Sequence, residues 1–290
     1  VFLFRISETR IQGAIAYVSL QKYDVDAPCI LVSDIRKALY STANFFYKNA
    51  WDKLNLIGIT GTKGKSTTAY YIKYILDEYL AETDGNESGL ASTLEIYDGI
   101  VRKPSTLTTP EPFELHKHFD NAVKSGTDFF TMEVSSQALK LDRVRGLKYR
   151  TAAFTNLYED HIAPNEHPDM EDYISCKLKI FDSCEKGTLN ADCEIADRVE
   201  EYCKGKVDLL TYSVEGSADF VARNLRPERR GHVTGTVFEL DSEYYKGDIF
   251  VALPGKFNVY NALCALAVCD KLGIPLADST AALSVVRVKG

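Results

Sequence analysis

The sequence predicts an α/β protein built on a mostly parallel β-sheet, and two observations lead to that prediction. From residue 54 onward, short apolar runs typical of buried strands alternate with helical patterns. This order is typical of a parallel sheet that is covered by helices on both faces. In addition, the first apolar run ends in a glycine-rich turn that opens a helix, which is the arrangement of a phosphate-binding loop. The predicted class is therefore a P-loop-containing α/β protein.

The phosphate-binding loop is expected at Gly61-Thr62-Lys63-Gly64-Lys65-Ser66, followed by a helix over 67–80. Backbone N–H groups and the positive end of a helix dipole converge at such a junction and suit a phosphate. Lys65 adds a cation for the outer phosphates, and Ser66 offers a hydroxyl to Mg²⁺. The loop is shorter than GxxxxGK[ST], because Ile59 stands where that pattern requires glycine. A surface glycine turn before a basic helix is the alternative interpretation.

Composition limits the class of protein further. A chain of 290 residues can bury a large core and suggests about two domains. Its net charge of −7 argues against a nucleic-acid or anionic-membrane partner. Arg5 interrupts the apolar start, so neither a signal peptide nor a membrane span is predicted. Seven cysteines without a CxxC pair indicate reduced, mostly buried thiols in a cytoplasmic protein, with Cys264 and Cys269 in the core.

Residues 1–53 are expected to form a first, partial α/β unit. Strands are predicted at 13–19 and 29–32, followed by a helix over 34–47 and a connector. The unit holds no catalytic constellation, so a substrate-holding module is the favoured interpretation. Because the chain starts without Met and within a predicted strand, we expect a fragment or a missing start.

The second unit is expected over 54–287, with 288–290 as the start of a linker. Further strands are predicted at 89–92, 93–97, 128–133, 151–155 and 187–192, and helices at 113–123, 170–184 and 194–203. Strands at 207–211, 220–225, 233–240 and 249–253, separated by turns, predict a small antiparallel annex, with the charged stretch 226–230 as a solvated turn. A final helix of small residues is expected to end near Leu272.

Polar side chains follow two of these strands at their carboxyl ends. Glu133 ends one strand, and a cluster containing Asn156, Asp160 and His161 follows the next. Carboxyl ends of parallel strands share one sheet edge with the phosphate loop, where many P-loop proteins place a Mg²⁺-binding acid. A helix-capping role is the alternative for Glu133. His161 is expected to bind metal or nucleotide, whereas the role of His167, in a loop, is left open.

Four further residues are interpreted from composition and spacing alone. Lys177 and Lys179 are two apart on a predicted helix and point to different faces, as solvated cations would. Asn258 and Asn261 are three apart on one helix face and can either present amides to a ligand or cap the helix.

Six motifs together resemble those of the Mur ligases of peptidoglycan synthesis, most closely the group that adds the third peptide residue. They are Gly61-Thr62-Lys63-Gly64-Lys65-Ser66, Thr108-Thr109-Pro110-Glu111, Met132-Glu133-Val134-Ser135-Ser136, Asn156-Leu157-Tyr158-Glu159-Asp160-His161, Tyr173-Ile174-Ser175-Cys176-Lys177 and Pro254-Gly255-Lys256-Phe257-Asn258-Val259-Tyr260-Asn261. The resemblance covers almost the whole chain. It implies a partial N-terminal domain that binds the UDP-substrate, a central ATP-binding ligase domain, and a third domain that this chain lacks.

The resemblance also implies roles for single residues. ATP would contact Gly61, Thr62, Lys63, Gly64, Lys65, Ser66, Thr67, Asn258 and Asn261, and the UDP-MurNAc-dipeptide would contact Thr108, Thr109, Ser135 and Arg143. Ser66 and Glu133 would bind one Mg²⁺, and Glu133, His161 and a carbamylated Lys177 a second, which reverses the compositional interpretation of Lys177. Lys65, Glu133, His161 and Lys177 would form the catalytic set, and Asn156 and Asp160 would order the site. Lys63 stands where the family usually has Asn.

The predicted function is therefore an ATP-dependent amide ligase that joins a free amino acid to the UDP-MurNAc-dipeptide through an acyl phosphate. The chain is expected to be a monomer that binds ATP and completes the reaction poorly on its own. One alternative is a related ligase acting on folyl-polyglutamate or poly-glutamate. A second alternative is a nucleotide-binding regulator of the GTPase type, but the sequence has no Asn-Lys-x-Asp motif for guanine recognition near the later strands. A third is a catalytically silent interaction module.

Overall fold

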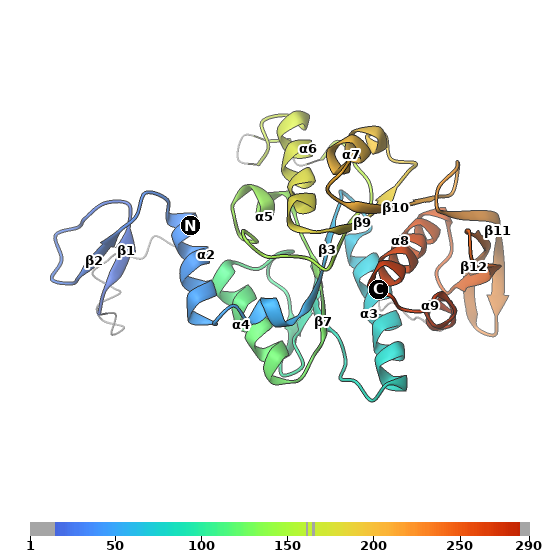
Figure 1. Ribbon diagram of the computed structural model, residues 1–290, viewed down its shortest axis with the longest axis horizontal. Helices are drawn as coiled ribbons and strands as arrows, with labels where there is room; N and C mark the ends of the chain where they lie inside the picture. The colour runs from blue at the N-terminus through green and yellow to red at the C-terminus, as the bar shows by residue number, and fades with distance from the viewer. Residues whose placement is uncertain (1–14, 161, 164–165, 285–290) are drawn as a thin grey trace.

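The computed structural model describes residues 15–160, 162–163 and 166–284 (Figure 1). Its main sheet has the order β13-β12-β11-β10-β9-β8-β3-β7-β4-β5-β6 within these residues. The strands are β3 (Asn55–Thr60), β4 (Gly89–Ala91), β5 (Glu95–Tyr97), β6 (Arg102–Pro104), β7 (Phe129–Glu133), β8 (Thr151–Phe154), β9 (Lys186–Asn190), β10 (Asp208–Ser213), β11 (Phe220–Arg230), β12 (Val233–Asp241) and β13 (Lys246–Val251). The predicted α/β class with a mostly parallel sheet is confirmed.

The parallel part of the sheet is larger than the sequence predicted. Strands β4, β7, β3, β8, β9, β10 and β11 pair in parallel from neighbour to neighbour, while β5–β6 and β11–β13 form antiparallel edges. The prediction that 207–211 belongs to the antiparallel annex is therefore wrong. Strand β10 pairs along its length with β9, and no local pattern in a single strand reveals the direction of its neighbour.

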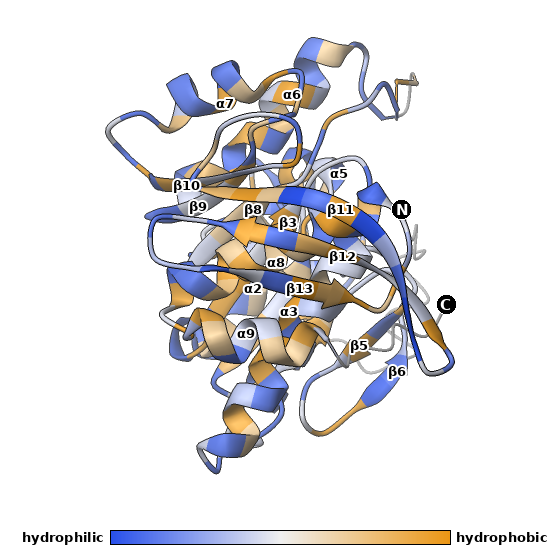
Figure 2. Cartoon of the chain, turned by 90° about the vertical axis from the view of Figure 1, so that its right-hand side faces the viewer, coloured by the Kyte–Doolittle hydropathy of each residue, from blue (hydrophilic) through white to orange (hydrophobic). Residues whose placement is uncertain are grey.

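The charged stretch 226–230 is part of strand β11 and not a turn. Its backbone pairs with β12 from Arg226, opposite Val237, to Arg230, opposite Val233. Figure 2 views this edge and shows hydrophilic and hydrophobic residues mixed along the hairpin of β11 and β12. Since the ladder is built from backbone groups, exposed charged side chains do not interrupt it.

Helices cover both faces of the sheet. They are α3 (Lys65–Glu82), α4 (Pro112–Lys124), α5 (Ser136–Lys140), α6 (Met170–Leu178), α7 (Ala196–Cys203), α8 (Lys256–Leu272) and α9 (Leu276–Leu283), with 3₁₀ turns η1 (Ala50–Lys53) and η2 (Lys179–Ser183). One buried apolar cluster gathers around α3, α8 and α9, and a second around α4, α6 and α7. The helix expected over 170–184 ends at Leu178 and continues as η2, and the sequence patterns did not predict α5 or α9.

The amino-terminal part stands beside the main body (Figure 1). Strands β1 (Tyr17–Ser19) and β2 (Cys29–Leu31) form their own two-stranded parallel sheet, and α2 (Ile35–Phe46) packs on α4. Asp34 caps α2, because its carboxylate accepts hydrogen bonds from two backbone N–H groups of the first turn. The beginning of the strand predicted at 13–19 lies outside the described residues.

All seven cysteines are free thiols, and Cys264 and Cys269 are completely buried in α8, as predicted. None of the helices in the part of the chain that the structure describes combines the length and the apolar composition needed to cross a bilayer.

Candidate active site

The conformation of the loop between β3 and α3 is fixed by two glycines and by the residues that follow β8. Gly61 and Gly64 have φ angles of 144° and 83°, which only glycine adopts without strain. The side-chain amide of Asn156 donates to the Lys63 carbonyl at 2.9 Å and accepts from the Lys63 N–H at 2.8 Å. The Thr155 hydroxyl donates to the same carbonyl at 2.9 Å. The loop is therefore preformed, as the ordering role predicted for Asn156 requires.

Two lysines from distant parts of the chain meet at this loop. Lys65, in the first turn of α3, donates to the carbonyl oxygens of Gly61 and Thr62 at 2.9 and 3.1 Å. Lys177, on α6, donates to the same Gly61 oxygen at 2.8 Å, and its ammonium lies 4.5 Å from the centre of the Tyr173 ring. The interpretation of Lys177 as a solvated cation is wrong, because its side chain is buried, whereas Lys179 is exposed.

Burial and charge act together on these two amines. Burial lowers the pKa of Lys177 well below its ordinary value, and the neighbouring charge of Lys65 lowers that pKa further. Burial also lowers the pKa of Lys65, although the carboxylates of Glu133 and Asp160 oppose that shift. Burial and the nearby charge of Lys65 therefore favour the uncharged form of Lys177, which is the more deeply buried of the two amines.

Glu133 lies at the carboxyl end of β7, beside the strand that leads into the loop. Its position in the sheet is opposite Ile59, and the side chain is buried. One carboxylate oxygen accepts from the Thr93 N–H at 2.8 Å, and the other from the Thr93 hydroxyl at 3.1 Å. That hydroxyl is also 3.2 Å from Thr108 Oγ1. Thr93 was not among the predicted site residues, although a polar residue after the parallel strand β4 is the same kind of signal as Glu133.

A cavity of about 150 Å³ joins the loop to the residues predicted to bind the acceptor. Its lining includes Gly61, Lys65, Lys177, Thr108, Thr109, Ser135, Ser136, Arg143 and Tyr173. The structure thus brings all four predicted acceptor residues to the two lysines.

Backbone and side chains tie this cavity wall together. The Thr109 hydroxyl donates to the Glu133 carbonyl at 2.9 Å and accepts from the Ser135 N–H at 3.0 Å. Arg143 donates to the Thr109 carbonyl at 3.2 Å and forms an ion pair of 2.8 Å with Glu111. The cavity wall is therefore held by bonds between segments far apart in sequence.

The two predicted amide residues of α8 behave differently. Asn261 is buried beside the loop, where its Oδ1 accepts from the Thr68 hydroxyl at 3.4 Å, and its Nδ2 has no hydrogen-bond partner among the described residues. Asn258 instead donates to the Pro254 carbonyl at 2.9 Å, at the start of its own helix. A cavity of about 300 Å³, lined by Asn156, Tyr158, Asp192, Phe257 and Tyr260 among others, opens at this end of α8.

The remaining predicted residues are placed as follows. Ser66 and Thr67 lie half-buried in the first turn of α3. The Lys63 side chain is exposed, 5.5 Å from the ring centre of Tyr158, so only its backbone holds the loop. The hydroxyl of Thr62 is 3.1 Å from that of Tyr173. His161 lies outside the described residues.

The fold and this loop define a P-loop α/β protein with a charged cavity next to the phosphate-binding turn. A sequence model of the Mur ligase middle domain matches residues 59–269. The chain belongs to the Mur ligase family.

Curated relatives agree with this assignment. The chain is 37% identical over 292 residues to UDP-N-acetylmuramoyl-L-alanyl-D-glutamate--2,6-diaminopimelate ligase of Caldanaerobacter subterraneus, covering 99% of this chain and 58% of the relative. It is 39% identical to the ligase of the same name from Clostridioides difficile, covering 85% and 49%. It is 34% identical to a UDP-N-acetylmuramyl-tripeptide synthetase of Bifidobacterium longum, covering 96% and 54%. The chain therefore spans about half the length of the curated relatives it matches.

The fold is shared with solved ligase structures. A UDP-N-acetylmuramoyl-L-alanyl-D-glutamate--2,6-diaminopimelate ligase structure superposes with a TM-score of 0.81 at 23% identity, covering 98% of this chain and 57% of the other. The MurF ligase of Thermotoga maritima, solved in complex with ADP, gives a TM-score of 0.65 at 17% identity, covering 98% and 60%.

Proposed function

We propose that this chain is the nucleotide-binding part of an ATP-dependent amide ligase that adds the third amino acid to UDP-N-acetylmuramoyl-L-alanyl-D-glutamate in peptidoglycan synthesis. One observation carries the proposal: Lys65 and Lys177 meet at the Gly61 carbonyl on the wall of a cavity that also holds the predicted acceptor residues. The names of the relatives supply the substrate. In this proposal residues 54–287 form the ATP-binding domain, and 1–53 are part of the domain that holds the UDP group.

The loop would hold the phosphates of ATP through its backbone N–H groups, as helix amino-termini do in other phosphate sites. Lys65 would leave the Gly61 and Thr62 carbonyls and turn its ammonium to the outer phosphates. The adenine would lie toward α8, where the Asn261 amide has a donor that no described residue uses. A buried donor without a partner is costly, so a ligand acceptor at this place is favoured.

The donors near the loop suit Mg²⁺, which prefers oxygen ligands. Glu133 offers carboxylate oxygens and Ser66 a hydroxyl, and His161 is retained as a proposed ligand from the motif. Carbamylation of Lys177 requires the uncharged amine, which burial and Lys65 favour here, and it would convert this amine into an oxygen donor. When bound, Mg²⁺ would neutralise charge on the transferred phosphoryl group.

The reaction would proceed in two displacements. The D-glutamyl carboxylate attacks the γ-phosphorus, the bond from that phosphorus to the bridging oxygen breaks, and acyl phosphate and ADP form. The amine of the incoming amino acid then attacks the acyl carbon, inorganic phosphate leaves, and the amine loses a proton. This chain's residues act by position and charge: Lys65 at the phosphoryl oxygens, and Arg143 with Ser135 and Thr108 at the acceptor. We propose a monomer that works in the cytoplasm.

Calorimetric titration of the 290-residue chain tests this proposal. We expect saturable binding of a non-hydrolysable ATP analogue with Mg²⁺, and binding of UDP-N-acetylmuramoyl-L-alanyl-D-glutamate, with no binding of a folyl-glutamate. Binding of the folyl-glutamate in place of the UDP compound would reassign the substrate. A preference for GTP over ATP in competition would support a nucleotide-dependent regulator instead.

A further inference from the structure

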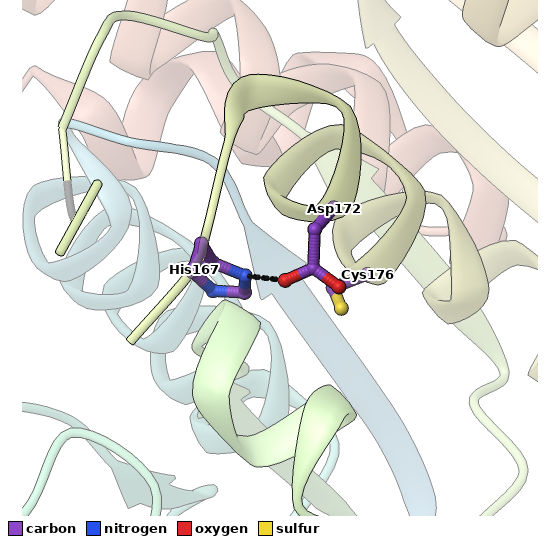
Figure 3. A group of neighbouring side chains, drawn as sticks. All are labelled: His167, Asp172 and Cys176. Carbon is purple, nitrogen blue, oxygen red and sulfur yellow. Dashed lines mark hydrogen bonds and ion pairs between the residues drawn. The ribbon is translucent and has the colours of Figure 1, made fainter. Parts of the chain in front are cut away.

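His167 links two helices, α5 and α6, that both contribute residues to the acceptor cavity. Its imidazole is completely buried. Nε2 is 2.9 Å from the hydroxyl of Ser136, the first residue of α5, and Nδ1 is 2.6 Å from a carboxylate oxygen of Asp172 on α6. Figure 3 shows the imidazole pointing to Asp172, with Cys176 one turn further along the helix.

Lys140, at the other end of α5, completes the link. Its ammonium donates to the same Asp172 oxygen at 2.6 Å and to the Glu166 carbonyl at 2.9 Å. The bond from Lys140, with a smaller contribution from His167, holds the pKa of Asp172 below its ordinary value despite partial burial. An ionised Asp172 only accepts hydrogen bonds, so the Nδ1 of His167 carries a proton.

The side chains of His167, Asp172 and Cys176 have ligand atoms of the types that bind transition metals. Atoms of His167, Asp172 and Cys176 lie within 4.8 Å of one another. However, one oxygen of Asp172 already accepts from both an ammonium and an imidazole N–H. A positive charge from Lys140 at this oxygen opposes a second cation, so a structural link is favoured over a metal site.

Helix α5 depends on such a link because it is only five residues long. Isolated helices of this length are unstable, so tertiary contacts decide where the helix lies. Its N-cap is Ser135, whose hydroxyl accepts from the Ala138 N–H at 3.1 Å and whose backbone N–H bonds to Thr109. Both Ser135 and Ser136 line the acceptor cavity, as do Tyr173 and Lys177 of α6.

We propose that His167 is a positioning residue of the acceptor site, which fixes α5 with its serines against α6 with Lys177. The inference rests on the proposed function, since it takes this cavity as the acceptor site. His167 itself is not one of the residues that line the cavity. Its loss would therefore weaken acceptor binding and leave nucleotide binding at the α3 loop unchanged, because within the described residues its side chain bonds to Ser136 and Asp172 and packs on Tyr173, on α5 and α6 rather than on α3 or α8.

The test compares His167→Ala with His167→Gln and Ser136→Ala, and uses His232→Ala as the control, because His232 is exposed in the turn between β11 and β12. Titration with UDP-N-acetylmuramoyl-L-alanyl-D-glutamate should give an acceptor Kd about tenfold higher for His167→Ala, or about 1.4 kcal/mol. His167→Gln should recover part of this loss through one remaining hydrogen bond. The Kd for the ATP analogue should stay within about twofold in all variants.

Hydrogen exchange provides a second measurement that does not depend on any ligand. In His167→Ala and, more mildly, Ser136→Ala, amides of α5 should exchange faster, while those of α3 and β3 keep their protection. Ser136→Ala removes a single hydroxyl, so it remains informative if His167→Ala fails to fold.

Three results would overturn the inference. The first is an acceptor Kd and a rate of α5 amide exchange that are both unchanged in His167→Ala and in Ser136→Ala. The second is an equal loss of acceptor and nucleotide binding, which would indicate general destabilisation. The third is covalent labelling of Ser136 by a fluorophosphonate that depends on His167, which would make the Ser136–His167–Asp172 arrangement a nucleophilic site. If the unmodified chain binds nucleotide but not the acceptor, the proposed function itself fails. If His167→Ala and Ser136→Ala both bind the acceptor normally, only the role of His167 is lost.

Discussion

The side-chain nitrogens of Lys65 and Lys177 share one acceptor, the carbonyl oxygen of Gly61, at 2.9 and 2.8 Å. Two amines this close, in a partly desolvated place, repel each other when both are charged. Either an anion must join them or one amine must lose its proton. The proposed site satisfies both conditions, since phosphates pair with Lys65 and CO₂ reacts with the uncharged form of Lys177.

We first predict that Lys177 takes up CO₂. Chain equilibrated with ¹³C-bicarbonate should show a carbamate carbonyl resonance in its ¹³C NMR spectrum, because burial and the nearby charge of Lys65 lower the pKa of the Lys177 amine and favour its reactive, uncharged form. Lys177→Ala should lack the resonance. Lys179→Ala is the matched control, two residues further on the chain and exposed, and should retain it. A resonance that survives Lys177→Ala would place the reactive amine elsewhere.

Nucleotide affinity should depend on the charge of Lys65 and much less on that of Lys63. Lys65→Met should raise the Kd for the ATP analogue by at least about tenfold, because a charge-assisted bond to phosphate is lost. Lys63→Met should change it by less than about threefold, since only the backbone of Lys63 holds the loop. Isothermal calorimetry measures both constants. Equal losses in the two variants would mean that the net charge of the loop, rather than the placement of Lys65, governs binding.

The conformation of the loop should tolerate no side chain at Gly61. A Cβ there would lie 2.0 Å from Thr155 Oγ1 and 3.2 Å from the Asn156 backbone nitrogen, at a φ of 144°. Gly61→Ala should therefore cost about 3 kcal/mol or more in the free energy of unfolding. Gly205→Ala has a positive φ of 74° and open space, so it should cost only about 1 kcal/mol. Urea unfolding gives both values, and equal costs would show that backbone strain alone matters.

Stability at low pH should depend on Asp98, which is completely buried. Burial raises the pKa of Asp98, but hydrogen bonds from His118, the Val101 N–H and Asn121 outweigh it and bring the pKa below its ordinary value. A depressed folded-state pKa stabilises the protein above about pH 4, and this contribution is lost as the pH falls through the folded-state value.

Asp98→Asn should thus lower the free energy of unfolding by about 2 kcal/mol at neutral pH. It should also flatten the decrease of stability in acid. Asp52→Asn, at an exposed carboxylate, should change stability by less than about 0.5 kcal/mol and keep the acid dependence. Thermal melts over a pH series give the comparison. An unaltered acid slope in Asp98→Asn would contradict the assignment.

Local patterns predicted the part of the site that local sequence builds. Strand β3, its glycine turn and helix α3 are contiguous, so the apolar run and the glycines were sufficient to predict them. Glu133 was found because the carboxyl ends of parallel strands meet at one edge. The parallel pairing of β10 with β9 was not predicted, because strand direction depends on a partner distant in sequence.

The burial of Lys177 and the role of His167 could not be derived from local patterns. Lys177 is buried because α6 packs it against the Tyr173 ring and the Gly61 carbonyl, which is 116 residues away in the chain. His167 is held by Ser136 of α5, a helix too short to leave a periodic pattern. Only motif resemblance suggested the role of Lys177, and nothing in the sequence suggested that of His167.

A crystal structure of this chain with Mg²⁺ and a non-hydrolysable ATP analogue tests the central proposal most directly. The account predicts that the phosphates lie on the N–H groups of 61–66, with the Lys65 ammonium moved from the Gly61 carbonyl onto a phosphate oxygen. Phosphates bound elsewhere, or a Lys65 that still donates to Gly61 with the nucleotide in place, would contradict it.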